Sequence, residues 1–245
     1  MIKINRGIWP FLTLLVVVFL AVPAMAQEEE KTGKVRVGKV SLSLKGPQGL
    51  SRVDGLSPEA DAYIRKLEPK FKLQVLAVYA DKNEWKKFSR AARSGQAVSI
   101  PRMALICVPR KMANKSYNIK AVRKEFKKYD NWFGVAANNR PMAAVLTRQA
   151  NSKLKEFMGV DLDFKYKTGP HTRKVSETSN SISLASRVSF KVNGKVTDGI
   201  LTATSMAVGD KLIFTGYFDE ASSDGQRDEI IARSIQWRSA LNSAQ

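Results

Sequence analysis

The stretch ISLASRVSFKVNGKVTDGILTATSMAVGDKLIFTGYF, residues 182–218, decides the fold of this chain. Two long runs with strand composition, 182–192 and 196–208, meet across Asn193-Gly194, a dipeptide whose tolerance of positive φ suits a tight hairpin turn. Gly209-Asp210 marks a second turn, which leads into a third run, 212–218. Three consecutive strands joined by such short turns predict an antiparallel meander.

A terminal helix follows the meander, from Asp224 to about Asn242. Its apolar residues recur at helical spacing and form a stripe broad enough to cover one face of a sheet. The stripe consists of Ile230, Ile231, Ile235, Trp237 and Leu241. The predicted fold class is therefore α+β, an antiparallel β-sheet with helices packed on it.

Strands and helices are also predicted upstream of the meander. Asp81 is expected to cap a helix, and Pro101 suggests an edge strand, a bulge or a late start of its strand. The polar segment 159–178 contains Gly169-Pro170 and predicts a long connection or a seam between two halves. The predicted strands are 35–44, 73–80, 98–108 and 142–147, and the predicted helices are 57–67, 81–88, 119–133 and 149–158.

The first residues have the order of a secretory signal peptide. Lys3 and Arg6 form a basic region, an apolar run covers 8–22, and Ala24-Met25-Ala26 is a small-x-small cleavage site. The apolar run is about 15 residues long, whereas a membrane-spanning helix needs about 20. We therefore expect a signal peptide at 1–26, no transmembrane segment after cleavage, and a location in the periplasm or outside the cell.

The rest of the chain is expected to be a charged, flexible arm, 27–34, followed by a single α+β domain, 35–245. The chain has 41 Lys and Arg against 22 Asp and Glu, a formal net charge of +19 at pH 7. A protein this basic attracts anionic partners over a long range. Cys107 is the only cysteine, so the chain contains no internal disulfide and depends on packing for its stability.

The residue types needed for common catalytic and metal sites are scarce. His171 is the only histidine, so the usual imidazole and thiolate sets for a transition metal cannot be assembled. Asp161 and Asp163 offer too few oxygens for calcium, and no metal or other cofactor is predicted. Paired carboxylates remain conceivable, because four acids lie at predicted element ends, where helix caps and turns also explain them. These acids are Asp54, Asp81, Asp219 and Glu220.

The predicted helix 119–133 is amphipathic and strongly basic. Its apolar residues fall on one stripe, while the basic residues crowd the other side, a composition typical of an element that binds a membrane surface or another anionic partner. The alternative is a helix packed on the core with a solvated lysine face. The predicted anion-binding residues are Lys120, Arg123, Lys124, Lys127 and Lys128.

Several short motifs resemble those of a loose family of secreted bacterial proteins of unknown function. They are Leu50-Ser51-Arg52-Val53-Asp54-Gly55 before a helix, Leu76-Ala77-Val78-Tyr79, Arg102-Met103, and the meander with its Trp237-bearing helix. The layout is similar to the PsbP-like α/β/α sandwich, named for an extrinsic subunit of photosystem II. The resemblance implies a fold and a compartment, and it carries over no catalytic residue.

Together these features predict an exported, non-catalytic envelope protein, a binding or accessory module with a basic surface. The expected partners are an anionic membrane surface, an acidic polysaccharide or an acidic protein. Nucleic acid is not expected as a partner, because export takes the protein to a compartment where nucleic acid is scarce. The alternative function is a hydrolytic enzyme with an unrecognised carboxylate site.

The basic helix generates a test. We expect that reversing Lys124, Lys127 and Lys128 to Glu leaves the free energy of unfolding nearly unchanged, because exposed charges contribute little each. The same variant should be retained less on anionic vesicles or acidic polysaccharide at low salt. Binding that is unchanged in this variant, or that ignores ionic strength, would contradict the hypothesis.

Overall fold

The protein is described from a computed structural model. The described residues are 34–56, 58, 61, 65, 68–69, 72–93, 100–117, 143–145, 147–148, 150–152, 163–192 and 194–242. The predicted signal peptide, the arm up to residue 33 and the predicted helix 119–133 lie outside these residues.

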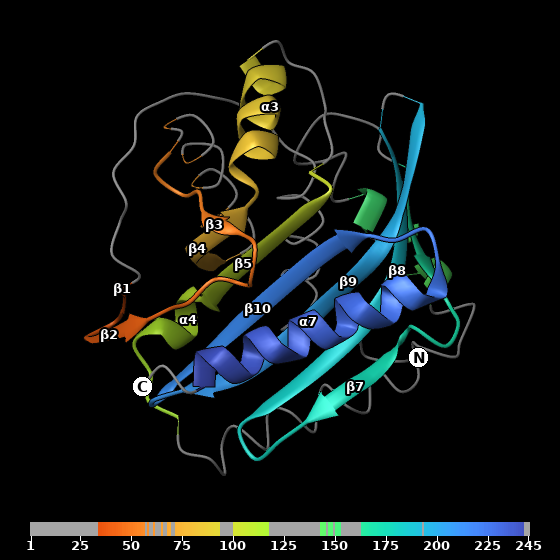
Figure 1. The fold of residues 1–245 in the computed structure, drawn as a ribbon. Coiled ribbons are helices and arrows are strands. Elements are labelled where there is room, and N and C mark those ends of the chain that lie inside the picture. Colours follow the sequence, from red (N-terminus) through yellow and green to blue (C-terminus); the bar gives the residue numbers. More distant parts are fainter. Residues whose placement is uncertain are drawn as a thin grey trace.

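The fold is α+β, as predicted, with a large antiparallel sheet and helices packed on it (Figure 1). The order of the strands in this sheet is β3-β4-β5-β10-β9-β8-β6, and β7 also pairs with β8. A separate two-stranded sheet consists of β1 and β2. The strands are β1 (Lys34–Val37), β2 (Val40–Ser43), β3 (Ser51–Arg52), β4 (Leu73–Ala80), β5 (Arg102–Pro109), β6 (Asp163–Lys167), β7 (Arg173–Glu177), β8 (Ser181–Val192), β9 (Lys195–Val208) and β10 (Lys211–Glu220). The described helices are α3 (Lys82–Arg93), α4 (Arg110–Ala113) and α7 (Asp224–Asn242).

The predicted meander is confirmed as β8, β9 and β10. β8 pairs with β9 from Ser181 opposite Met206 to Val192 opposite Lys195, so the register continues to the turn. Gly194 and Gly209 have φ values of 81° and 60° in the two turns, a region of the backbone map that favours glycine. The long ladders on either side of β9 form the centre of the sheet.

The predicted terminal helix is also confirmed, and α7 lies across one face of the meander (Figure 1). Trp237 is 4 % exposed, and its rings lie 6.2 Å and 6.4 Å from those of Tyr79 and Tyr217, measured between centroids. The Trp237 Nε1–H donates a 2.7 Å hydrogen bond to the carbonyl of Lys45. Trp237 therefore joins α7 to the sheet and to the chain that follows β2.

The other face of the sheet is covered as well. Trp85 and Phe88 of α3 are buried in a second core, and their rings stack with centroids 5.2 Å apart. Alternate residues of β5 divide between the two cores: Leu105 and Cys107 face α3, whereas Ile106 faces the α7 side. β5 is buried on both sides, so its near-continuous apolar sequence fits an interior strand.

Side chains complete the outer edge of β4. Arg52 forms a bidentate ion pair with Asp54 and also donates to the Leu76 carbonyl (3.0 Å). The Asp54 carboxylate accepts from the Val78 amide (2.9 Å). Arg110 and Glu68 form a second ion pair, three residues earlier along β4. Arg110 Nε donates to the Leu73 carbonyl, and Glu68 accepts from the Val75 amide. Each pair supplies one donor and one acceptor, as a neighbouring strand would.

Side chains also cap β6, the other edge of the sheet. The Asn151 amide both donates to the carbonyl of Phe164 and accepts from its backbone N–H, at 2.9 Å and 3.0 Å. The Tyr166 backbone N–H donates to Thr147 Oγ1 at 3.0 Å. The described residues of 143–152 are helical, so the strand predicted at 142–147 is wrong. Thr147 and Asn151 are four residues apart, which places both on the helix face toward β6.

Two further sequence expectations differ from the structure. The strand expected at 35–44 is the hairpin of β1 and β2, and the sequence marks the break, because the apolar alternation skips a step between Val37 and Val40. The segment 159–178, expected as a connection or seam, contributes β6 and β7, which pair with successive parts of β8. Of the three alternatives for Pro101, an edge strand, a bulge or a late start, the structure has the late start, since β5 begins at Arg102.

Replacing Trp237 with Ala should lower the free energy of unfolding by roughly 3–5 kcal/mol, because a buried indole is lost and a cavity remains. Denaturant titration followed by circular dichroism measures this change. The matched control is Val196→Ala, whose side chain is 60 % exposed and should shift the midpoint little. Equal midpoints for Trp237→Ala and the wild type would show that the indole does not stabilise the fold.

Candidate functional site

The five predicted anion-binding residues, Lys120, Arg123, Lys124, Lys127 and Lys128, lie outside the described residues. The basic segment that precedes them is described in part. Arg110 bonds to β4, as above, whereas Lys111 and Lys115 have exposed side chains. The described part of the chain nevertheless contains a basic site elsewhere.

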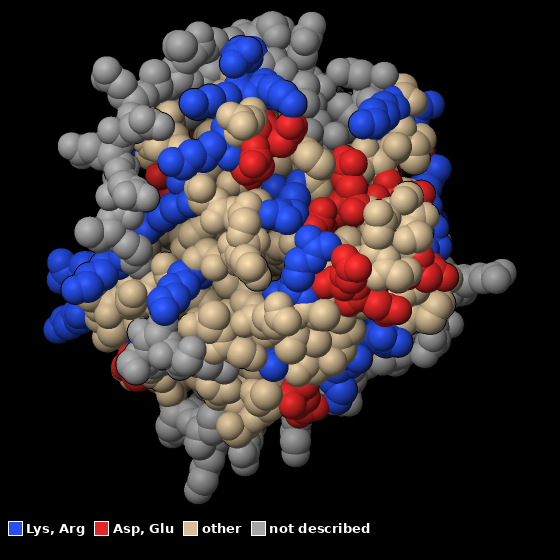
Figure 2. Space-filling view, in the orientation of Figure 1, with Lys and Arg blue, Asp and Glu red and all other residues tan. Residues whose placement is uncertain are grey.

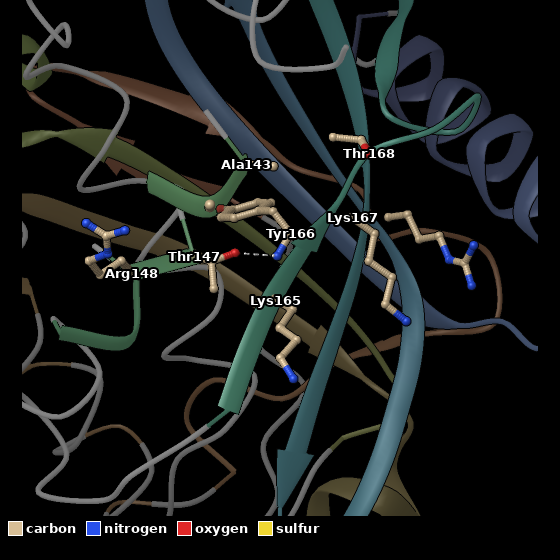
Figure 3. Close-up of a pocket in the computed structure, with 9 residues that line it drawn as sticks. Ala143, Thr147, Arg148, Lys165, Tyr166, Lys167 and Thr168 are labelled. Carbon is tan, nitrogen blue, oxygen red and sulfur yellow. Dashed lines mark hydrogen bonds between the residues drawn. The ribbon is translucent and has the colours of Figure 1, made fainter. Parts of the chain in front are cut away.

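A pocket of about 750 Å³ opens at the edge of the sheet, between β6 and the helical residues 143–148 (Figure 3). Four cations and no carboxylate are among the residues that line it. The lining residues are Ala143, Ala144, Thr147, Arg148, Lys165, Tyr166, Lys167, Thr168 and Arg187. This composition makes the pocket the strongest candidate for a binding site in the described part of the chain.

Successive side chains of β6 point to opposite faces of the strand. Tyr166 points toward the helical segment that carries Thr147 and Arg148, whereas Lys165 and Lys167 extend from the other face of the strand (Figure 3). Arg187 lies directly opposite Lys167 in the ladder, so the two side chains share a face. The cations therefore surround the strand from both faces at the place where β6 ends.

The four cations differ in how far their charge is compensated. Lys165 pairs with Asp163 at 2.8 Å, and Lys167 pairs with Asp198 at 2.5 Å. Arg148 and Arg187 have no carboxylate partner among the described residues, and the buried Nε of Arg187 has no hydrogen-bond acceptor there. The pocket thus holds an excess of positive charge, which favours an anionic group.

The uncharged residues of the pocket suit the same kind of ligand. Thr168 and Thr147 offer hydroxyl groups, while Ala143, Ala144 and the ring of Tyr166 form an apolar wall. Burial raises the pKa of Tyr166 above its usual value, so its phenol stays neutral and adds no negative charge. An anionic group with a small apolar or sugar-like body fits these surroundings.

The four carboxylates considered from sequence lie apart from this pocket. Asp54 is held by Arg52 and the Val78 amide at the far edge of the sheet. Asp81 caps α3, as predicted, because its Oδ1 accepts from the amides of Asn83 and Glu84 at 2.8 Å and 3.0 Å. These two acids have structural partners.

Asp219 is part of a polar cluster at the end of β10. Its carboxylate accepts from Tyr217 Oη at 3.0 Å and from Arg233 at 3.2 Å. Burial raises the pKa of Asp219, and the hydrogen bond from Tyr217 and the nearby Arg233 oppose that shift. Glu220, the next residue, adds like charge that raises the same pKa. The cluster ties β10 to α7.

Cys107 and His171, the chain's only thiol and only imidazole, are far from each other. Cys107 is fully buried in β5, and His171 lies in the loop between β6 and β7, where it is 7 % exposed. Three strands separate β5 from that loop, a distance of roughly 20 Å at the usual strand spacing. His171 Nε2 is 3.5 Å from Asp228 Oδ1, so the histidine packs against the start of α7. The geometry does not assemble a Cys–His dyad.

Sequence reasoning did not find the pocket, because its cations are scattered through the chain. Arg148, Lys165 and Arg187 are far apart in sequence and belong to different elements. The one local signal is the alternation Lys165-Tyr166-Lys167, which is typical of a strand with a cationic outer face. This alternation lies within the polar segment 159–178, which was expected to be a connection, so no strand was predicted there.

Among the described residues, no group of three or more His, Cys, Asp or Glu is arranged to hold a metal ion. The described helices include none with the length and apolar character needed to cross a membrane.

The environment of Cys107 generates a prediction. Burial raises the pKa of its thiol well above the usual value, so the native protein should react with Ellman's reagent at pH 8 only when it unfolds. Labelling across a denaturant titration should therefore follow the loss of circular dichroism. Cys107→Ala supplies the blank, and rapid stoichiometric labelling without denaturant would contradict the burial.

Comparisons with known proteins add no family to these observations. No family model matches the chain, and neither a curated protein nor a solved structure matches it. The resemblance to PsbP-like secreted proteins stays a prediction.

Proposed function

We propose that this protein is an exported, non-catalytic binding or accessory module of the cell envelope that recognises anionic partners. The partners are anionic lipid, acidic polysaccharide or acidic protein. The pocket at the edge of β6 is the site that receives an anionic group of such a partner.

The observation that carries this proposal is the charge of the pocket. Arg148 and Arg187 bring two cations that no described carboxylate compensates, beside the partly compensated Lys165 and Lys167. Guanidinium groups bind phosphate, sulfate and carboxylate oxygens with directed hydrogen bonds. A neutral partner would leave this positive charge without compensation.

The alternative, a hydrolytic enzyme with a carboxylate site, has less support. Asp54 and Asp81 bind backbone amides, and Asp219 binds Tyr217 and Arg233. A pair of carboxylates that divides the roles of acid and base needs a shared cleft. The pocket described above has cations where such a pair is required.

Export is the part of the proposal that depends on the sequence alone. The order of basic region, apolar run and Ala24-Met25-Ala26 supports a signal peptide that is removed after Ala26. The net charge of +19 suits a compartment rich in phosphate-bearing lipids and acidic polysaccharides.

Exchange of both uncompensated arginines, Arg148→Gln with Arg187→Gln, should weaken binding to a sulfated polysaccharide. Loss of two charge-assisted hydrogen bonds is expected to reduce affinity roughly tenfold or more. The measurement is the salt concentration that elutes each protein from a heparin column, with thermal unfolding as the check on folding.

The matched control is Lys191→Gln with Lys195→Gln, which removes the same charge from exposed positions beside the β8–β9 turn. If the pocket binds the anion, the pocket variant elutes at lower salt than the control. Equal elution of the two variants would show that only net charge matters and would overturn the pocket as the site.

A further inference from the structure

The hairpin of β1 and β2 has two unlike faces. Val37 and Leu42 point inward and are buried against the α7 side of the sheet. On the outer face, Lys34 lies opposite Ser43 and Arg36 lies opposite Ser41, and all four side chains are exposed. Each outer cation thus has a hydroxyl group as its cross-strand neighbour.

The hairpin and the chain that follows it carry basic charges only. Lys39 lies in the turn and Lys45 follows β2, and both are exposed. The sequence has no Asp or Glu between residues 34 and 53. None of the four cations has an ion-pair partner among the described residues, and Arg36 bonds only to the Gly38 carbonyl. We call Lys34, Arg36, Lys39, Lys45, Ser41 and Ser43 the hairpin patch.

The molecule displays this patch at its periphery. Figure 2 shows a group of Lys and Arg side chains at the left of the molecule, where Figure 1 places β1 and β2. Most acidic side chains visible on this face lie at the right (Figure 2). Lys and Arg side chains also lie at the top and among the acids at the right, whereas few acids are visible beside the hairpin (Figure 2).

The hairpin patch is held in place from beneath. Leu44 is 3 % exposed, and the next carbonyl, that of Lys45, accepts the hydrogen bond from Trp237. At the turn, a Cβ on Gly38 would lie 2.6 Å from the carbonyl oxygen of Ala113, so the turn packs closely on the end of α4. Because the backbone is fixed, binding orders only the ends of the side chains.

We propose that the hairpin patch docks on an anionic phospholipid surface. Phosphate oxygens accept from Lys, Arg and Ser donors, all of which the patch presents together. A bilayer requires only an outward array of cations, each of which adds about 1 kcal/mol near a negative surface. Residues 34–50 contain no aromatic side chain on which a sugar ring would stack, so a membrane fits the patch better than a polysaccharide does.

This docking is separate from the proposed function of the pocket. The pocket lies at β6, which ends the sheet opposite to β3 and β4, whereas the hairpin packs beside β4 and α4. A protein docked through the hairpin patch keeps the pocket free for a second anionic group. The two surfaces have no residue in common, so they can be tested independently.

The experiment is co-sedimentation of the mature chain with vesicles of phosphatidylglycerol and phosphatidylcholine at low salt. Lys34→Gln with Arg36→Gln should weaken binding on the order of 25-fold, about fivefold for each cation removed. The control is Lys86→Gln with Arg90→Gln, which removes two exposed cations from α3 and should bind nearly as the wild type does. Pure phosphatidylcholine vesicles should bind none of these proteins.

Unchanged vesicle binding by the hairpin variant would overturn the proposal, and so would an equal loss in the α3 control. A hairpin variant that elutes early from heparin but binds vesicles normally would assign the patch to polysaccharide and also overturn it. Arg148→Gln with Arg187→Gln, tested on the same vesicles, should lose less binding than the hairpin variant, because the hairpin patch stays intact. If the pocket variant and its control elute from heparin at equal salt, the pocket proposal is overturned but the vesicle result for the hairpin is unaffected. The two proposals therefore fail separately.

Discussion

The backbone hydrogen bonds at the two outer sides of the sheet are the constraint on which the sheet depends. An edge strand has a row of backbone donors and acceptors that no neighbouring strand satisfies, and natural proteins cover or blunt such edges. Here Arg52–Asp54 and Arg110–Glu68 complete the part of β4 that the two-residue strand β3 leaves unpaired, while Thr147 and Asn151 complete β6. The interior strands can be almost wholly apolar because polar side chains close the sheet at both ends.

This constraint separates structural charges from charges that are free to bind. Arg52 and Arg110 donate hydrogen bonds to carbonyls of β4, although the sequence alone shows them only as two more cations in a basic chain. Arg148 and Arg187 have no such duty among the described residues, and neither have Lys34 and Arg36 on the hairpin. The pocket and the hairpin patch are therefore two separate basic surfaces, the first at the β6 end of the sheet and the second beside β4.

Packing on both faces connects these surfaces to the core. Residues of β5 alternate between the α3 side and the α7 side, so the strand packs against both layers. Trp237 contacts Tyr79 and Tyr217 and bonds to Lys45, so one side chain fixes α7, the sheet and the hairpin together. The stripe of α7 also contains Arg227 and Arg238, both 6 % exposed, so the helix is less apolar than its isoleucines suggest.

The sequence by itself determined the elements whose signals are local. Asn193-Gly194 and Gly209-Asp210 predicted the meander because turn chemistry acts within a few residues, and Asp81 predicted its helix for the same reason. The hairpin at 34–43, the helical residues 143–145 and 147–148 and the strands within 159–178 were missed, because tertiary pairing overrode weak local patterns. Only the tertiary structure decided the pocket, since it brings together Arg148, Lys165 and Arg187 from three elements. The pairing of Arg52 with Asp54 at a bulge of β4 was decided in the same way, because the unpaired carbonyl of Leu76 exists only once β4 and β5 have paired.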